Sequence, residues 1–322
     1  MSMPPAPALE LEDLHVASSD GISILHGVSL SLSPGEVLGL VGESGCGKSM
    51  TGATAMGMLP PGLSLRSGKV RIGGQEVQDL DELALSRLRG QKIALIPQDA
   101  TASLNPTKTI GKHLTEGLRR HRGMSPEAAL TGARELLERV GLTPAEKWLR
   151  EYPHQLSGGM NQRVAIARAL TGAPDILIAD EPTTALDVTT QAQILDLLLG
   201  LARTRNLALL FVTHDLGVVA QIADRVAVMY CGRVVETAPV KAFFAAPLHP
   251  YSAGLRASIP PLDARRTIVP LPGTVPTPGA LPEGCAFHPR CGRVLEQCRK
   301  DRPPLEAFGA GKVACYAARA PA

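Results

Sequence analysis

The residues most able to carry chemistry form a glycine-rich segment near the start of the chain. This segment fits the pattern G-x-x-x-x-G-K-S/T, and it consists of Gly42, Glu43, Ser44, Gly45, Cys46, Gly47, Lys48 and Ser49. Backbone N–H groups of such a loop, and the N-terminus of the helix that follows, attract phosphate oxygens. We therefore expect Lys48 to reach the β- and γ-phosphates of ATP and the Ser49 hydroxyl to bind Mg²⁺. We interpret Cys46, at a variable position, as a neutral substitution.

Two adjacent acids follow an apolar run farther along the chain. Residues 176–179 read Ile-Leu-Ile-Ala, and Asp180 and Glu181 come directly after them. Acids often end strands, so the pair gains its meaning from the phosphate loop upstream. We expect Asp180 to hold Mg²⁺ and Glu181, whose side chain points elsewhere, to polarise the attacking water.

The elements that position these residues follow from the apolar pattern. Short, continuous apolar runs favour strands that are covered on both faces, as in a parallel α/β sheet, and they lie at residues 37–41, 93–96, 176–179 and 207–212. Helical spacing links Ala133 to Val140 and Ile194 to Leu201. Residues 99 to 165 show helices without convincing strands, which predicts a helical insertion. The chain contains no internal repeat and therefore one nucleotide site.

Two further segments complete a family resemblance. Residues 156–163 read Leu-Ser-Gly-Gly-Met-Asn-Gln-Arg and resemble the ABC signature, while residues 183–187, Thr-Thr-Ala-Leu-Asp, resemble the D-loop. Gln98 resembles the Q-loop glutamine and His214 the switch histidine. Residues 8–250 thus resemble an ABC nucleotide-binding domain. The resemblance implies a RecA-like P-loop core with antiparallel β and α-helical subdomains.

The resemblance also implies roles for individual residues. Ser157 is a good helix N-cap, and the glycines after it allow close approach to a phosphate. In this family the signature contacts the ATP bound by the opposite subunit, so hydrolysis needs a second ATPase domain. The resemblance adds Gln98 to the Mg²⁺ site and gives His214 a part in stabilising charge. The remaining positions that it implies at the nucleotide are Ser157, Gly158, Gly159, Gln162 and Asp187.

A finer resemblance is to the ATPases of oligopeptide and dipeptide importers. It rests on residues 103–106 (Ser-Leu-Asn-Pro), 152–155 (Tyr-Pro-His-Gln) and 181–193. The two threonines before Ala185 resemble the first of the two ATPases in that subgroup. The expected partners are a second, different ATPase, two transmembrane permease subunits and an extracytoplasmic binding protein. The expected place is the cytoplasmic face of the inner membrane, as a peripheral subunit.

Two positions depart from the family pattern. Family members usually carry an aromatic residue near the end of the first strand, where it stacks on adenine, and here Ala17 or Ser18 takes that place. We expect weaker stacking and a relaxed affinity or base selectivity. Asn161 stands in the signature segment where the family often has Arg or Lys, with no consequence that the sequence predicts.

Four cysteines and many prolines distinguish residues 251–322. The spacing between the four cysteines fits neither the usual zinc spacing nor a ferredoxin run, so spacing alone indicates only a metal site. They are Cys285, Cys291, Cys298 and Cys315. Residues 284–291 resemble the C-terminal extension of peptide-importer ATPases. We expect an ordered extension with a 4Fe–4S cluster, with Zn²⁺ as the alternative. His288 is a candidate substitute ligand, which we interpret instead as a solvated side chain. The proline run from Pro260 to Pro289 predicts extended or looped chain.

Composition limits the remaining alternatives. The net charge of +3 argues against a dedicated nucleic-acid binder, and no apolar run reaches the length of a membrane-spanning helix. The start, Met-Ser-Met-Pro-Pro, does not resemble a secretory signal. An ATPase for nickel, glutathione or another small solute stays open, as do an exporter and, more remotely, an ABC ATPase acting on nucleic acid or the ribosome. A plain P-loop kinase would lack the signature.

Overall fold

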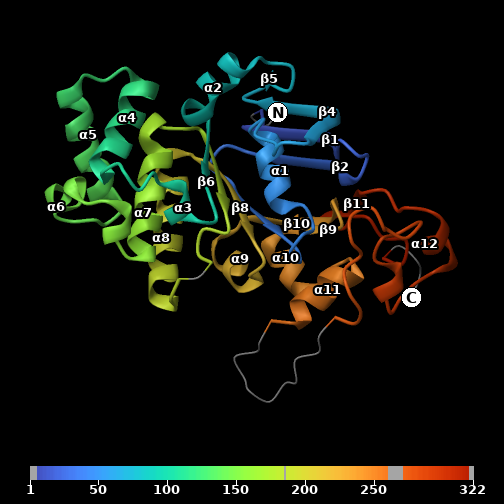
Figure 1. Cartoon of the computed structure of the whole chain (residues 1–322). Helices are drawn as coiled ribbons and strands as arrows, with labels where there is room; N and C mark the ends of the chain where they lie inside the picture. The colour runs from blue at the N-terminus through green and yellow to red at the C-terminus, as the bar shows by residue number, and fades with distance from the viewer. Residues whose placement is uncertain (1–5, 185, 260–270, 319–322) are drawn as a thin grey trace, which may run out of the picture. The chain divides into compact units, whose positions relative to one another are not determined.

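The computed structural model describes residues 6–184, 186–259 and 271–318 (Figure 1). The chain divides into two compact units. Unit 1 comprises Met1–Leu9, Leu32–Glu36 and Arg71–Phe211, and unit 2 comprises Glu10–Ser31, Val37–Val70 and Val212–Ala322. Some residues used above lie outside the described residues. They are the five N-terminal residues, Ala185 of the D-loop, and the prolines at 260, 261 and 270.

Unit 2 contains five neighbouring strands of mixed direction. Their order is β11 (Glu306–Phe308), β12 (Gly311–Val313), β10 (Arg233–Pro239), β9 (Arg225–Tyr230), β3 (Val37–Val41). Strands β3 and β9 pair in parallel, while β10 runs antiparallel to β9 and to β12. Every residue of β3 is buried, as expected for a strand covered on both faces.

Unit 2 also contains most of an antiparallel sheet and several helices. The sheet order is β2 (Ser23–Leu32), β1 (Leu9–Ser18), β4 (Leu63–Ile72), and leucine and valine side chains of β1 and β2 are buried at intervals along them. The helical elements of this unit are α1 (Lys48–Ala55), α9 (Leu216–Ile222), α10 (Val240–Ala245), α11 (Pro250–Ala257), η3 (His288–Arg290) and α12 (Glu296–Lys300).

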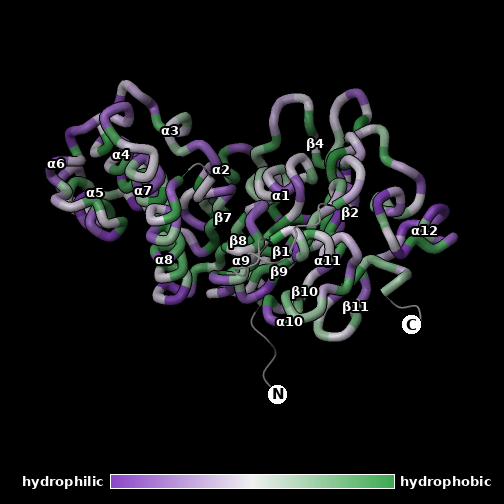
Figure 2. The backbone as a smooth tube through the Cα atoms, turned by 90° about the horizontal axis from the view of Figure 1, so that it is seen from below, coloured by the Kyte–Doolittle hydropathy of each residue, from purple (hydrophilic) through white to green (hydrophobic). Residues whose placement is uncertain are grey.

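Unit 1 holds strands in the order β8 (Ala208–Thr213, of which Val212 and Thr213 belong to unit 2), β7 (Ile176–Asp180), β6 (Ile93–Ile96). Strands β6 and β7 are parallel, with Ile93 opposite Ile176. Two helices, α2 (Glu82–Gln91) and α8 (Val188–Arg205), belong to this unit, as does β5 (Gln75–Glu76), which pairs with the end of β4. Along α8 hydrophobic and hydrophilic stretches alternate (Figure 2), and its buried side chains include Ile194, Leu198 and Leu201.

Residues 100–169 of unit 1 form helices and no strand. They are α3 (Ala100–Ser103), α4 (Ile110–Arg122), α5 (Pro126–Arg139), α6 (Ala145–Arg150), η1 (Pro153–Gln155) and α7 (Gly158–Ala169), followed by η2 (Leu170–Gly172). Side-chain caps start several of them: Asp99, Thr109 and Ser125 each accept a hydrogen bond from a backbone N–H in the first turn. Figure 1 shows α4, α5, α6 and α7 grouped together.

The four strands predicted from apolar runs are confirmed, with β8 shifted by one residue. Both helical spacings are confirmed by α5 and α8. The prediction that the proline run contains no helix is wrong at Pro289, which lies in the first turn of η3 where its missing N–H costs nothing. None of the helices in the described part of the chain is both long and apolar enough to cross a membrane.

Candidate functional site

The glycine-rich loop lies in unit 2, between the end of β3 at Val41 and the start of α1 at Lys48. Gly47, the N-cap of α1, has φ of 104°, a conformation that side-chain-bearing residues rarely adopt. A Cβ atom on Gly42 would lie 2.3 Å from the Met229 carbonyl oxygen, which belongs to β9. Glycine is therefore required at both places, and the backbone of the loop can follow the tight path that exposes its N–H groups.

Lys48 is folded back onto this loop. Its ammonium donates hydrogen bonds to the carbonyl oxygens of Gly42 (2.8 Å) and Glu43 (3.2 Å), and the side chain is buried. The neighbouring Cys46 is buried too, and burial raises the pKa of its thiol. A protonated, buried thiol is unreactive, which agrees with our interpretation of Cys46 as neutral. Ser44, Gly45 and Ser49, by contrast, are exposed.

The acidic pair lies in unit 1, at the end of β7. Glu181 has φ of 45°, in the left-handed region, which is uncommon for a glutamate. Its Oε2 accepts hydrogen bonds from the Thr184 hydroxyl (2.9 Å) and from Nε2 of Gln98 (3.4 Å). The structure thus joins two predicted residues, Gln98 and Glu181, and adds Thr184. The two hydrogen bonds hold the Glu181 carboxylate beside Gln98 and Thr184.

The signature and the D-loop each begin a helix of unit 1. Ser157 caps α7 by accepting the N–H of Met160 (3.4 Å), and Asp187 caps α8 by accepting the N–H of Thr190 (2.9 Å). The backbone hydrogen bond from Thr190 lowers the pKa of Asp187. A Cβ on Gly158 would meet nothing within 4 Å, whereas one on Gly159 would lie 2.6 Å from Cγ2 of Thr190. Gly159 therefore allows the two helix starts to pack, and Gly158 leaves the start of α7 open.

Two predicted residues occupy contrasting environments. His214 follows β8 in unit 2 and is exposed, next to Asp215, which caps α9 by accepting the N–H groups of Gly217 and Val218. Gln162 lies in α7 and is buried, and its amide nitrogen has no hydrogen-bond partner among the described residues. The sequence interpretation placed Gln162 at the nucleotide, and its burial inside unit 1 indicates a packing role as well.

The comparisons with known proteins agree with this arrangement. The family model described as ABC transporter matches residues 25–184, and the one described as oligopeptide/dipeptide transporter, C-terminal region, matches residues 235–298. The chain is 46% identical over 298 residues to the oligopeptide transport ATP-binding protein AppD of Bacillus subtilis (strain 168), covering 92% of this chain and 91% of AppD. It is 45% identical to the oligopeptide transport ATP-binding protein OppD of Salmonella typhimurium, covering 97% and 95%. The chain belongs to the ABC transporter ATP-binding proteins.

Solved structures show the same ABC fold. The ATP-binding cassette MJ0796, in a dimeric post-hydrolysis state bound to ADP and Pi, matches with a TM-score of 0.65 and 32% identity. The match covers 72% of this chain and 98% of that one. The cbiO1 protein of Clostridium perfringens matches with a TM-score of 0.66 and 28% identity, covering 74% of this chain and 91% of cbiO1. The α/β P-loop core expected from the sequence is confirmed as that of an ABC ATPase.

Four cysteines of this ABC protein lie in the described residues 271–318. All four are free, and they line one small cavity together with His249, His288 and Phe287. Burial raises the pKa of Cys285 to about 11 and also raises those of Cys291 and Cys315. No group of three or more His, Cys, Asp or Glu side chains within the described ranges is arranged to hold a metal ion. The four thiols thus share a cavity without forming a recognisable metal site in the described part of the chain, and the expected metal-cluster extension stays a prediction.

Sequence reasoning missed a polar network that joins the Q-loop segment to the signature helix. Asn161 of α7 is buried and donates hydrogen bonds to the Pro153 carbonyl (3.0 Å) and to the Thr101 hydroxyl (3.2 Å). Arg168, about two turns farther along α7, donates to the Ser103 carbonyl (2.7 Å). The position that looked like a departure from the family pattern is thus a structural link between α7 and the residues just after Gln98.

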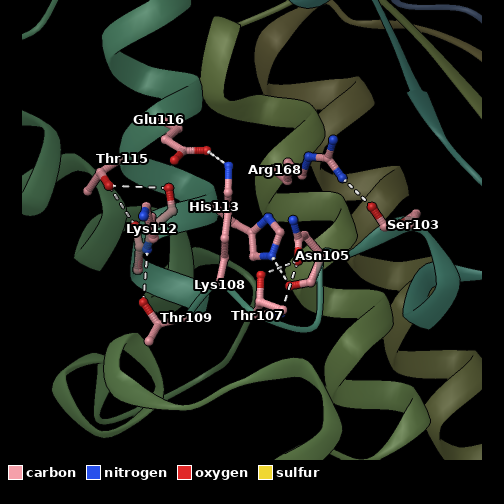
Figure 3. A network of polar contacts seen from close by, with 11 residues as sticks. Ser103, Asn105, Thr107, Lys108, Thr109, Lys112, His113, Thr115, Glu116 and Arg168 are labelled. Carbon is pink, nitrogen blue, oxygen red and sulfur yellow. Dashed lines mark hydrogen bonds and ion pairs between the residues drawn. The ribbon is translucent and has the colours of Figure 1, made fainter.

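The same network continues through the Ser-Leu-Asn-Pro segment (Figure 3). Asn105 Oδ1 accepts hydrogen bonds from the backbone N–H (2.9 Å) and hydroxyl (2.7 Å) of Thr107. His113 donates from Nε2 to the Asn105 carbonyl (3.1 Å), and burial lowers the pKa of this histidine. The neutral ring therefore ties α4 to this segment. The signal in the sequence was the Ser-Leu-Asn-Pro motif, which we used only to place the subgroup.

Replacing Asn161 with leucine tests this link. The substitution keeps the approximate volume but removes the two hydrogen bonds of the Asn161 amide, and the Pro153 carbonyl keeps the Leu156 N–H (3.2 Å). The loss of two bonds costs about 1–3 kcal/mol. We expect the free energy of unfolding in urea to fall by that amount. The exposed Gln221 on α9 supplies the control, because Gln221→Leu removes an amide without a buried partner. Equal stability of the two variants would contradict the assignment of Asn161 as a link.

Proposed function

We propose that this chain is the ATP-hydrolysing subunit of an ABC importer for di- and oligopeptides. The observation that carries the proposal is the intact phosphate loop, with Lys48 buried against it, in a chain similar over nearly its whole length to oligopeptide transport ATP-binding proteins. The match of residues 235–298 to the oligopeptide/dipeptide C-terminal region supports the peptide class. An importer ATPase for nickel, glutathione or another small solute is the alternative, since this subunit does not contact the cargo.

The proposed mechanism gives each motif one task. The triphosphate binds the N–H groups of residues 42–49, and Lys48 leaves the loop carbonyls to neutralise the β- and γ-phosphates. The oxygen-bearing side chains of Ser49, Asp180 and Gln98 are of the type that Mg²⁺ prefers, and that ion would offset phosphate charge. Glu181 orients and deprotonates the attacking water, and His214 stabilises the charge that develops.

The proposed partner at the nucleotide is a second ATPase, of a different kind in this subgroup. The start of α7 supports this, because Ser157 caps the helix while Gly158 leaves space in front of it. A helix N-terminus bare of side chains suits a phosphate group, here that of the opposite subunit's ATP. Asp187, at the start of α8, would connect the two sites. Hydrolysis would then open the pair of ATPases and drive two permease subunits between inward and outward states.

The experiment that tests this assembly is an affinity purification of the tagged chain from detergent-solubilised native membranes. We expect two multi-span subunits, a second ATPase and an extracytoplasmic binding protein to come with it, which would place the chain at the cytoplasmic face of the inner membrane. The binding protein would then identify the cargo. Recovery of ribosomal or nucleic-acid-bound proteins instead would favour the remote alternative and overturn the transport proposal.

A second test addresses the missing adenine-stacking residue. Ala17 is buried, so an aromatic ring at position 17 would not face outward. Ser18 is half-buried, and its hydroxyl accepts the N–H of Ile22 (3.0 Å). Position 18 is therefore the one of the two where we place an aromatic ring. We expect Ser18→Tyr to lower the KM for ATP about fivefold, because an aromatic pair contributes about 0.5–1.5 kcal/mol. Ser18→Ala is the control for loss of the hydroxyl. If both variants have the same KM, adenine does not bind beside this strand.

We further propose that Cys285, Cys291, Cys298 and Cys315 ligate a 4Fe–4S cluster, with Zn²⁺ as the alternative. Support comes from the four thiols sharing one cavity and from the N–H of Arg293, which donates to Sγ of Cys291 (3.3 Å). Such a cluster would be structural or regulatory. Iron and sulfide analysis of anaerobically purified protein tests it, with Cys298→Ser expected to lose both and Cys231→Ser to keep them. Stoichiometric zinc without sulfide would overturn it.

A further inference from the structure

An ion pair within unit 2 joins the cysteine-bearing segment to the phosphate loop. Arg290 and Glu43 are 247 positions apart in the sequence, yet two parallel hydrogen bonds connect them. Nη1 of Arg290 lies 2.8 Å from Oε2 of Glu43, and Nη2 lies 3.0 Å from Oε1. This two-point geometry is the strongest that arginine makes with a carboxylate, and it fixes orientation as well as distance.

The guanidinium of Arg290 is held on its other sides too. The side chain is 4% exposed, compared with 28% for Glu43. Nε donates to the Pro272 carbonyl (2.8 Å), Nη1 also donates to the Tyr230 hydroxyl (3.3 Å), and the rings of Tyr230 and Phe287 lie 5.8 Å from Cζ. Hydrogen bonding to Glu43 is the main cause that raises the pKa of Arg290. These hydrogen bonds and ring contacts fix the position of the buried guanidinium.

The backbone of Glu43 connects this ion pair to the residues that we expect to bind phosphate. Its backbone N–H donates to the hydroxyl of the buried Tyr251 (2.9 Å), and its carbonyl accepts from the ammonium of Lys48 (3.2 Å) and the N–H of Cys46 (3.3 Å). The ring of Tyr251 packs on Tyr230 at 4.6 Å between centroids. Side chain and backbone of Glu43 are therefore both anchored outside the loop, while Lys48 is anchored on Glu43.

We propose that Arg290 is a positioning residue for the phosphate loop, and that the segment carrying the cysteines thereby sets the affinity for ATP. The inference rests on the proposed ATP-binding function and adds a determinant outside its motifs. Arg290 does two things in this account. It holds the loop in the shape that receives the triphosphate, and it neutralises a carboxylate that would otherwise repel the phosphates.

The neutralisation of the Glu43 carboxylate by Arg290 can be tested separately from the positioning of the loop. Arg290→Met keeps the length of the side chain but leaves Glu43 charged and unpaired, and we expect the Kd for ATP to rise about 10-fold or more. Glu43→Gln removes the charge, and we expect a rise of about threefold because the neutral amide bonds Arg290 more weakly. The double variant should bind ATP more weakly than Glu43→Gln alone, because it also loses the remaining bonds to Arg290. It should still bind better than Arg290→Met, because no unpaired carboxylate repels the phosphates. Isothermal titration of the full-length chain with ATP measures all three values of Kd. In the assembled transporter, Arg290→Met should raise the KM for ATP while kcat at saturating ATP changes less than twofold.

The controls separate positioning from general stability. Arg299→Met removes an exposed arginine of α12 and should leave the Kd unchanged, and Arg290→Lys, which keeps the charge but not the paired geometry, should give an intermediate Kd. If Arg290→Met is unfolded, Arg290→Lys and Glu43→Gln carry the test. A lower melting temperature with an unchanged Kd, or a double variant weaker than Arg290→Met, would overturn the inference. Failure of the unmodified chain to bind ATP would instead overturn the proposed function.

Discussion

Glu181→Gln is expected to lower ATP turnover by about 10²–10⁴-fold, the range that general acid–base catalysis contributes. The carboxylate lies at the end of β7 with φ of 45°, and its Oε2 accepts hydrogen bonds from Thr184 and Gln98. Glutamine has the same shape, and its amide oxygen can accept both bonds. The variant therefore keeps the local structure and loses only the negative charge that draws a proton from water.

The measurement is steady-state phosphate release at saturating ATP, with equilibrium ATP binding in parallel. We expect binding to change less than twofold, because the charge that is lost acts on the water and not on the bound triphosphate. Glu138→Gln, an exposed glutamate of α5 in the same unit, is the matched control and should retain full turnover. Turnover of Glu181→Gln near that of the control would remove Glu181 from the role of base.

The second large effect is expected from Lys48→Met, which should weaken ATP binding by about 10–150-fold. This range follows because a hydrogen bond to a charged group contributes about 1.5–3 kcal/mol. The ammonium donates hydrogen bonds to the carbonyls of Gly42 and Glu43, and the side chain is buried. Methionine preserves the packing of the stem against the loop but cannot neutralise the β- and γ-phosphates. We therefore expect a loss of affinity with a small change in stability.

Titration with ATP and thermal unfolding of the same samples distinguish a loss of ATP affinity from a loss of stability. Lys241→Met, on the exposed side of α10 in the same unit, controls for loss of a positive charge and should bind ATP normally. Unchanged affinity in Lys48→Met would mean that the glycine-rich loop does not hold the triphosphate. A large drop in melting temperature would show that Lys48 mainly stabilises the loop.

The parallel strands and the motif residues could be predicted because their signals are local. Residues 37–41 form a continuous apolar run, and a strand covered on both faces needs little else. The loop after it is specified by glycines at 42 and 47, where any side chain would collide with its neighbours. For the same reason Ser157 could be recognised as a helix start before its hydrogen bond was seen.

The features that escaped prediction depend on contacts between distant parts of the chain. Nothing near Arg290 indicates a partner at Glu43, and a buried asparagine at 161 looks like any other polar substitution until Pro153 and Thr101 are placed beside it. Strand β12 has three residues, too few for a pattern. The boundary near residue 250 stays a prediction, although the described residues after it belong to the same compact unit as the phosphate loop.

Strand β12 has a consequence for the behaviour of the protein in solution. It pairs antiparallel with β10, placing Val313 opposite Glu236 and Lys312 opposite Thr237, and β11 then covers β12. Without residues 306–313, one side of β10 would present unpaired backbone N–H and C=O groups next to the apolar Val234 and Val235. Such an open strand is a template for another chain's strand. The last part of the sequence therefore also protects the sheet against self-association, and a chain shortened before residue 306 should form aggregates by edge-to-edge pairing.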